Sequence, residues 1–303
     1  MMTPTDSAAM SDADSIIFDC DGVLVDIVDS YNETISQTVS CVLDRLGYKK
    51  TPPVTGGIIQ AFKDTGGFNN EVDLAYGVIV SMAAARDAGL DIRSVVMRAS
   101  ESPDVSSVQK FAMSVSDVSH TLDRLAYPGR DSMVQEIFDQ IFYGPELYRS
   151  VFGQDSQFDK PGLIENEKVL LDDALSESLQ KRFGQKMALV TGRGYDSARH
   201  TLGDRIDLFS LEASAFLEDK PRWLAKPNPE SLDSAIRIMD ADICIYVGDS
   251  AEDMMMARRA HLPVIFVGVY GTAPDPVSRR RLFESYGVRY TVPDIAHLPS
   301  LLH

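Results

Sequence analysis

The chain has 303 residues, 44% of them hydrophobic and 24% charged, so it is long enough to bury one large apolar core or two smaller ones. Its net charge of -16, from 45 acidic and 29 basic residues, opposes docking on nucleic acid or on an anionic membrane, because both are polyanions. A small anionic ligand remains compatible, since a few local cations outweigh the global charge at short range.

Cysteine usage and the amino-terminal segment indicate a reduced, aqueous setting. The three cysteines, Cys20, Cys41 and Cys244, are too few and too scattered for a disulfide framework or a zinc site. Residues 1–14 are polar and acidic, unlike a signal peptide, and the first dozen are predicted to form a flexible tail. No apolar run approaches the roughly 20 residues that cross a bilayer. We expect a soluble, cytoplasmic protein, and its oligomeric state cannot be read from the chain.

Short apolar runs that end in polar residues predict buried strands. They are residues 15–18 ending at Asp19, 186–190 ending at Thr191, 243–247 ending at Gly248-Asp249, and 263–267 ending at Gly268. Helical patterns at 169–183 and 229–239 lie between these runs. This alternation predicts an α/β fold with a doubly wound, Rossmann-like parallel sheet, in which ligands bind beyond the carboxyl ends of the strands.

The first two predicted strands are separated by roughly 165 residues, far more than one crossover helix requires. Much of the interval has helical patterning, at 31–46, 74–88, 108–125 and 132–143. We therefore predict an α/β core domain of residues 12–29 and 165–303, with an inserted, mainly helical cap domain at 30–164. The alternative is a set of extra helices packed on the same core.

The first strand is followed by Asp19-Cys20-Asp21-Gly22. Residues two apart in an extended segment point the same way, so Asp19 and Asp21 can face one pocket, and Gly22 permits a sharp turn. Two adjacent carboxylates repel unless a cation intervenes, which suits a metal site or an acid–base pair. A solvent-facing acidic turn is the alternative, disfavoured by the apolar residues on both sides.

The second predicted strand ends in Thr191-Gly192-Arg193-Gly194. A hydroxyl flanked by flexible backbone at a helix start offers several donors to an anion. The alternative is a strand-to-helix turn in which threonine only caps the helix.

The segment Lys226-Pro227-Asn228-Pro229 opens the next helix. Proline at an early helical position and asparagine as the cap place Lys226 just outside the positive helix end. The helix dipole repels a lysine there, and an anion bound between the two would relieve the conflict. A lone exposed lysine is the alternative.

The third predicted strand leads into Gly248-Asp249, with Asp253 about one helical turn later. Both carboxylates can therefore converge on one hard cation, and magnesium prefers a few carboxylates, several waters and a phosphate oxygen. Helix capping followed by favourable acidic residues is the alternative.

The chain resembles the haloacid dehalogenase (HAD) superfamily in the order of its four motifs, each of which lies beside an apolar strand. These motifs are D-x-D-G, T-G-R, K-P-N-P and G-D-x-x-x-D. The likeness covers residues 15 to about 267. Within the superfamily, the chain resembles the phosphatase branch that has a helical cap after the first strand, of the phosphoglycolate phosphatase type. It implies a magnesium-dependent hydrolase of phosphate monoesters, acting on phosphoglycolate, a sugar phosphate or a similar small metabolite through an aspartyl-phosphate intermediate.

The resemblance also implies the role of each motif residue. Asp19 is expected as the nucleophile and Asp21 as the general acid and base. Thr191 and Lys226 are expected to hold the phosphoryl oxygens, with Gly192 and Arg193 near the phosphate, although Arg193 facing solvent is an open alternative. The expected Mg²⁺ ligands are Asp19, the backbone carbonyl of Asp21, Asp249, and Asp253 directly or through water.

Substrate selection is expected to come from the cap. Residues 61–70 form a glycine-containing polar segment, in which Lys63 is a candidate contact to the substrate; a plain helix–helix connection is the alternative. Two other functions stay open: a phosphomutase of the same superfamily, and a non-catalytic binding protein. The intact carboxylates argue against the binding protein, which has no need of such a repulsive cluster.

Overall fold

The computed structural model describes residues 10–63, 65, 67–68, 70–129 and 131–302. The chain divides into two compact units, one of Met1–Val28 with Glu167–His303 and one of Asp29–Asn166, which we call the core and the cap. The predicted boundaries, at 29/30 and 164/165, lie one and two residues from these divisions. The cap buries an apolar cluster drawn from Ile35 to Ile164, so the inserted segment folds around an apolar centre of its own.

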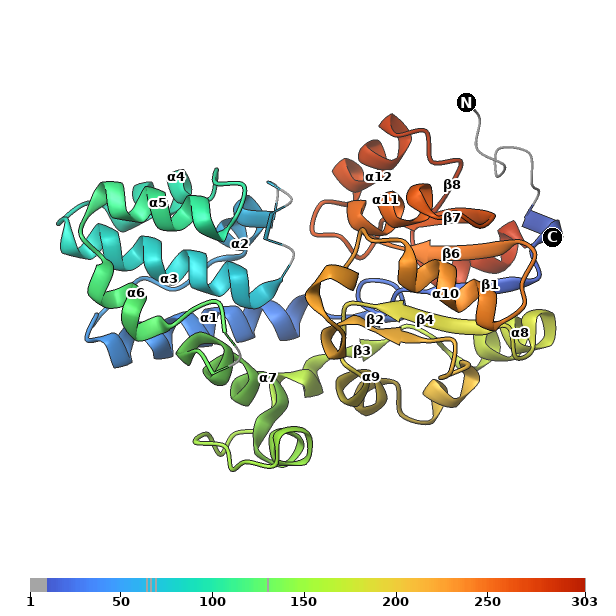
Figure 1. Cartoon of the computed structure of the whole chain (residues 1–303), viewed down its shortest axis with the longest axis horizontal. Helices are drawn as coiled ribbons and strands as arrows, with labels where there is room; N and C mark the ends of the chain where they lie inside the picture. Colours follow the sequence, from blue (N-terminus) through green and yellow to red (C-terminus); the bar gives the residue numbers. More distant parts are fainter. Residues whose placement is uncertain (1–9, 64, 66, 69, 130, 303) are drawn as a thin grey trace. The chain divides into compact units, whose positions relative to one another are not determined.

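The core is built on one parallel sheet in the order β5-β4-β1-β6-β7-β8 (Figure 1). These strands are β1 (Ser15–Phe18), β4 (Met187–Thr191), β5 (Ala215–Phe216), β6 (Cys244–Gly248), β7 (Val264–Val269) and β8 (Tyr290–Val292). The four strands predicted from apolar runs are therefore confirmed, as neighbours at the centre of the sheet. The doubly wound α/β prediction is also confirmed.

Helices lie against both faces of this sheet: α8 (Asp173–Phe183), α9 (Tyr195–Leu202), α10 (Glu230–Ile238), α11 (Ala251–Arg259) and α12 (Pro276–Ser285). Two separate apolar clusters result. Ile16 and Phe18 join the cluster that holds residues of α8 and α9, whereas Ile17 joins the cluster that holds residues of α10 and α11. Because successive strand residues point to opposite faces, a strand covered on both faces is apolar throughout.

The strand register brings the predicted motifs to one edge. Phe18 is paired with Leu189 of β4 on one side and with Val247 of β6 on the other. Asp19, Thr191 and Asp249 thus leave neighbouring parallel strands at nearly the same level. This is the carboxyl edge, where ligands bind in open α/β sheets.

Two predictions in the core need correction. The pattern at 169–183 is not helical from its start, because Lys168–Val169 form β3, which pairs antiparallel with β2 (Val25–Asp26), and α8 begins only at Asp173. The predicted tail is wrong for Met10–Asp12, a 3₁₀ turn (η2) whose Met10 is buried; residues 1–9 lie outside the described part.

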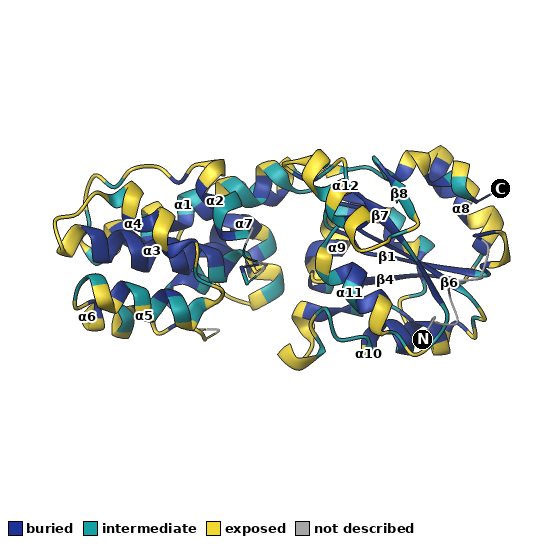
Figure 2. Cartoon of the chain, turned by 90° about the horizontal axis from the view of Figure 1, so that it is seen from above, coloured by how far each residue is buried: buried dark blue, intermediate teal, exposed yellow. Residues whose placement is uncertain are grey.

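The cap is helical, as predicted, and contains α1 (Val28–Leu46), α2 (Gly56–Lys63), α3 (Glu71–Asp87), α4 (Ile92–Ala99), α5 (Val105–Val115), α6 (Ser119–Leu125) and α7 (Met133–Phe152). Helix α3 is buried along most of its length (Figure 2). The pattern at 108–125 forms two helices rather than one, because Ser116 is extended and ends α5. The last predicted cap helix runs on to Phe152 through a kink at Gly144.

Short 3₁₀ turns complete the chain: η3 (Leu163–Asn166), η4 (Gly203–Leu208), η5 (Leu217–Asp219), η6 (Arg222–Leu224) and η7 (Ile295–Leu301). Among the described residues, no helix combines the length and the apolar character needed to cross a bilayer.

Candidate active site

The turn after β1 places Asp19 at the carboxyl edge of the sheet. The Cys20 carbonyl accepts hydrogen bonds from the N–H groups of residues 23–25, at 3.2, 2.8 and 3.0 Å, which folds the chain back on itself. Gly22 has a φ of +70°, a left-handed conformation that favours glycine. Its carbonyl accepts from Thr272 Oγ1 at 2.5 Å, so this turn is tied to the loop after β7.

Three carboxylates meet beside this turn. Ligand oxygens of Asp19, Asp249 and Asp253 lie within 4.8 Å of one another. Asp249 follows β6 directly, and Asp253 lies in the first turn of α11, where Ser250 caps the helix and accepts from the Asp253 N–H at 3.1 Å. The structure therefore brings together three of the carboxylates that the sequence assigned to one cation.

Lys226 lies among these carboxylates. Its Nζ is 2.8 Å from Asp19 Oδ1 and 2.7 Å from Asp253 Oδ1, and its side chain is 8% exposed, so the exposed-lysine alternative is wrong. Burial by itself lowers the pKa of Lys226, but the two carboxylates raise it overall. The predicted asparagine cap is displaced by one residue: Pro229 holds the cap position, and Asn228 Oδ1 accepts from Glu230 N at 3.0 Å.

The electrostatics of the cluster show an excess of negative charge. Burial raises the pKa of Asp19 well above its ordinary value; Lys226 opposes the shift, and the neighbouring carboxylates add to it. Burial also raises the pKa of Asp249 to about 7, although the Arg279 guanidinium opposes the shift. A divalent cation would relieve this repulsion, and buried carboxylate oxygens are the donor set that Mg²⁺ prefers. Asp19, Asp249 and Asp253 therefore fit the expected metal.

Asp253 is already engaged by other groups. Its Oδ1 accepts from Tyr246 Oη at 2.6 Å and from Lys226, and its Oδ2 accepts from Ser250 N at 3.1 Å and Ser250 Oγ at 2.6 Å. Burial would raise the pKa of Asp253, but Lys226 and these donors lower it overall. A carboxylate offers about four lone-pair positions, so these bonds favour contact with a metal through water over direct ligation. Sequence reasoning missed Tyr246, because an apolar strand gives no sign of which hydroxyl reaches a carboxylate.

Thr191 is the last residue of β4 and is fully buried, with Oγ1 accepting from Arg193 N at 3.3 Å. Gly192 is exposed beside it. The N-cap of α9 is Gly194, so the interpretation of Thr191 as a helix cap is wrong.

The backbone donors at the start of α9 are used by the protein itself. Gly194 N donates to Glu218 Oε2 at 2.9 Å, and Tyr195 N donates to Asp219 Oδ2 at 2.8 Å. The prediction that this helix start offers several donors to an anion is therefore wrong for these two N–H groups. Burial raises the pKa of Glu218, and the N–H of Gly194 opposes the shift. The Glu218-Asp219 pair has no sequence motif that marks it.

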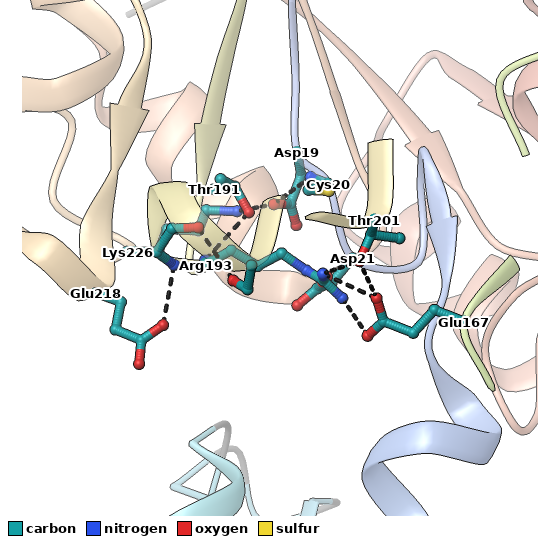
Figure 3. A network of polar contacts seen from close by, with 11 residues as sticks. Asp19, Cys20, Asp21, Glu167, Thr191, Arg193, Thr201, Glu218 and Lys226 are labelled. Atoms are coloured by element: carbon teal, nitrogen blue, oxygen red, sulfur yellow. Dashed lines mark hydrogen bonds and ion pairs between the residues drawn. The ribbon is translucent and has the colours of Figure 1, made fainter. Parts of the chain in front are cut away.

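Arg193 does not face solvent. Its side chain is 1% exposed and forms ion pairs with Asp21 and Glu167 (Figure 3). The Asp21 side chain thus points to Arg193, while its backbone contact to the metal stays a prediction. Glu167 was missed because no sequence motif marks this residue, which comes directly after the inserted cap.

Lys63 lies in the cap, at the carboxyl end of α2. Its Nζ is 3.2 Å from Glu71 Oε1, and its side chain is 30% exposed. Residues 61–63 of the predicted polar loop belong to α2, and residues 64, 66 and 69 lie outside the described part. The proposed substrate contact of Lys63 stays a prediction.

Comparisons with known proteins agree with this architecture. The structure of the phosphatase Tt82 from Thermococcus thioreducens aligns with a TM-score of 0.60 at 20% identity, covering 89% of this chain and 98% of that one. A protein from Haemophilus somnus, described as a predicted phosphoglycolate phosphatase, aligns with a TM-score of 0.50 at 13% identity, covering 97% of this chain and 100% of that one. At these identities the likeness shows the fold.

Sequence comparison adds two findings. An imidazoleglycerol-phosphate dehydratase from Phytophthora nicotianae is 35% identical over 103 residues, which are 33% of this chain and only 22% of that protein. The model of the haloacid dehalogenase-like hydrolase family matches residues 13–261. This range includes the strands β1, β4 and β6 and every motif at their ends. The chain therefore belongs to the haloacid dehalogenase-like hydrolase family.

Proposed function

We propose that this protein is a magnesium-dependent phosphatase that hydrolyses a small phosphorylated metabolite through a phosphorylated Asp19. One observation carries the proposal: the carboxylates of Asp19, Asp249 and Asp253 cluster at the carboxyl edge of the sheet, and the ammonium group of Lys226 pairs with Asp19 and Asp253. An enzyme that must bring an anionic nucleophile to an anionic phosphate needs this combination of carboxylates and cations.

In the first step a carboxylate oxygen of Asp19 attacks phosphorus, forming a bond from that oxygen to phosphorus while the bond to the leaving oxygen breaks. Lys226 and the hydroxyl of Thr191 hold the phosphoryl oxygens and stabilise the charge that spreads over them. Asp19 and Asp249, with Asp253 through water, would hold Mg²⁺, which would supply positive charge to offset the repulsion between carboxylate and phosphate.

Asp21 completes both steps of the reaction. As a carboxylic acid it gives its proton to the departing alkoxide, and as a carboxylate it then takes a proton from the water that attacks the aspartyl phosphate. This second displacement releases inorganic phosphate and regenerates the Asp19 carboxylate. Asp21 suits both steps because its side chain stays 26% exposed while that of Asp19 is 8% exposed.

The substrate class is proposed from the resemblance and the cap. A cap inserted after the first strand and the fold of a predicted phosphoglycolate phosphatase support a phosphoglycolate-like or sugar phosphate substrate. The unpaired state of Cys20, Cys41 and Cys244 fits the reducing cytoplasm, where we expect the enzyme to act.

A phosphate-release assay over a panel of metabolites tests the function. We expect Mg²⁺-dependent release that disappears with a chelator and with Asp19→Asn, and a phosphorylated Asp19 peptide after acid quenching of the wild-type enzyme. Substantial turnover by Asp19→Asn would remove Asp19 as the nucleophile. An isomerised sugar phosphate in place of free phosphate would instead identify a phosphomutase.

A further inference from the structure

The guanidinium group of Arg193 is bound on several sides by this protein's own side chains (Figure 3). Nε donates to Asp21 Oδ1, Nη1 donates to Glu167 Oε2 at 3.0 Å and to Thr201 Oγ1 at 3.2 Å, and Nη2 donates to Glu167 Oε1 at 2.5 Å. Arginine has five N–H groups, and this network uses at least four of them. The planar fork of Arg193 is therefore committed to two carboxylates and a hydroxyl.

The charge of Arg193 is balanced within the protein. Glu167 is fully buried and paired with Arg193 through both carboxylate oxygens, so its negative charge cancels that of the guanidinium. A guanidinium that is buried and bound on these sides by the protein offers mainly fixed geometry. The phosphate contact predicted for Arg193 would have to displace these bonds.

Glu167 is held in turn by its surroundings. Thr201 Oγ1 donates to Glu167 Oε2 at 2.6 Å, and the following strand β3 pairs with β2. Leu170 N donates to Leu24 O at 2.8 Å, which ties this strand to the turn that carries Asp21. Glu167 and Asp21 are thus connected through backbone hydrogen bonds as well as through the guanidinium of Arg193.

Asp21 needs such a hold because of its neighbours. Its charge acts on both Asp19 and Asp249, and repulsion between like charges favours movement of its side chain toward solvent. The general acid has to stay within hydrogen-bond reach of the leaving oxygen. The bond from Arg193 Nε opposes that movement.

We propose that Arg193, anchored by Glu167, is a positioning residue that holds the Asp21 carboxyl group where it protonates the leaving oxygen. This inference rests on the proposed function and deepens it. Arg193 acts on the reaction only through Asp21 and does not touch the phosphate. Its removal should therefore matter most for substrates whose leaving group needs a proton.

The test compares kcat/KM on p-nitrophenyl phosphate and on phenyl phosphate, which have similar shapes. The second leaves as a more basic phenolate and depends more on the general acid. Arg193→Lys keeps the charge but cannot bind both carboxylates as a fork. Arg193→Gln combined with Glu167→Gln removes both buried charges together, because deletion of one alone risks unfolding. Arg182→Lys, on α8 at contacts with Met10 and Leu302, is the matched control.

We expect both Arg193 variants to lose at least about tenfold more kcat/KM on phenyl phosphate than on p-nitrophenyl phosphate, whereas Arg182→Lys changes the ratio little. Addition of Arg193→Lys to Asp21→Asn should cause no further loss, because the two residues act as one unit. Equal losses on both substrates, or additive losses in the double variant, would overturn the proposal while wild-type phosphate release still supports the function. A wild-type enzyme that releases no phosphate from either aryl ester or from the metabolite panel would overturn both.

Discussion

Substitution of Gly22 by alanine should damage the metal site through a single methyl group. A Cβ at this position would lie 2.7 Å from Asp249 Cγ and 3.3 Å from Asp249 Cβ, where ordinary contact begins at 3.4 Å. Asp249 Oδ2 would lie closer still, so the side chain would have to move by at least about 0.7 Å, the difference between 3.4 and 2.7 Å. Metal sites tolerate roughly 0.2 Å in ligand distance, so this movement should weaken Mg²⁺ binding markedly.

The backbone strain of the same substitution can be measured separately. Gly22 has a φ of +70° and Gly287 a φ of +71°, and a Cβ at Gly287 meets nothing within 4 Å. Both alanine variants should lose about 1–2 kcal/mol of unfolding free energy from the left-handed conformation. Only Gly22→Ala adds the displacement of Asp249, and misplacement approaching 1 Å costs about a hundredfold in rate.

The assay combines urea unfolding, Mg²⁺ titration by calorimetry and phosphate release from p-nitrophenyl phosphate. We expect similar stability losses in the two variants, with weaker Mg²⁺ binding and the large loss of kcat/KM confined to Gly22→Ala. If Gly22→Ala binds Mg²⁺ as well as Gly287→Ala does, Asp249 is not the ligand that we infer.

Two further predictions concern polar contacts in the core. Burial would raise the pKa of Asp14, but the hydrogen bond from Lys186 at 2.7 Å, with two backbone N–H donors, lowers it below 3.8. Asp14→Asn should therefore lower the unfolding free energy by about 1 kcal/mol at pH 7, and this difference from wild type should shrink as the pH falls below 3.8. Urea unfolding at pH 7 and pH 3.5 measures the difference, and a constant value would contradict the prediction. Tyr246→Phe removes one hydrogen-bond donor from Asp253, and it should lower the unfolding free energy by about 2 kcal/mol and slow phosphate release severalfold. Thermal unfolding measures the first effect, and unchanged stability would show that the bond contributes little.

The sequence predicted the central strands and the residues at their ends because both follow from local chemistry. An apolar run such as Ile16-Ile17-Phe18 is typical of a strand covered on both faces. Parallel pairing then fixes where the run ends, so Asp19 and Asp249 had to meet at one edge. The helical insertion was evident from the long interval and its periodicity.

The short and irregular elements were less predictable. Strand β3 has only two residues, and its Val169 was read as the start of the helix at 169–183 because this apolar residue continues the helical period. The break between α5 and α6 depends on the extended backbone of Ser116, which the apolar period across 108–125 conceals.

The order of the motifs along the chain, and the carboxylates and cations in them, were determined by the sequence alone, because each motif is encoded within a few residues. Tertiary structure alone decided that Arg193 binds Asp21 and Glu167, that Tyr246 donates to Asp253, and that Glu218 accepts from the start of α9. These contacts join segments that pair only once the sheet and its helices have packed. The direction of a long side chain such as that of Arg193 depends on which distant groups satisfy its charge when it is buried.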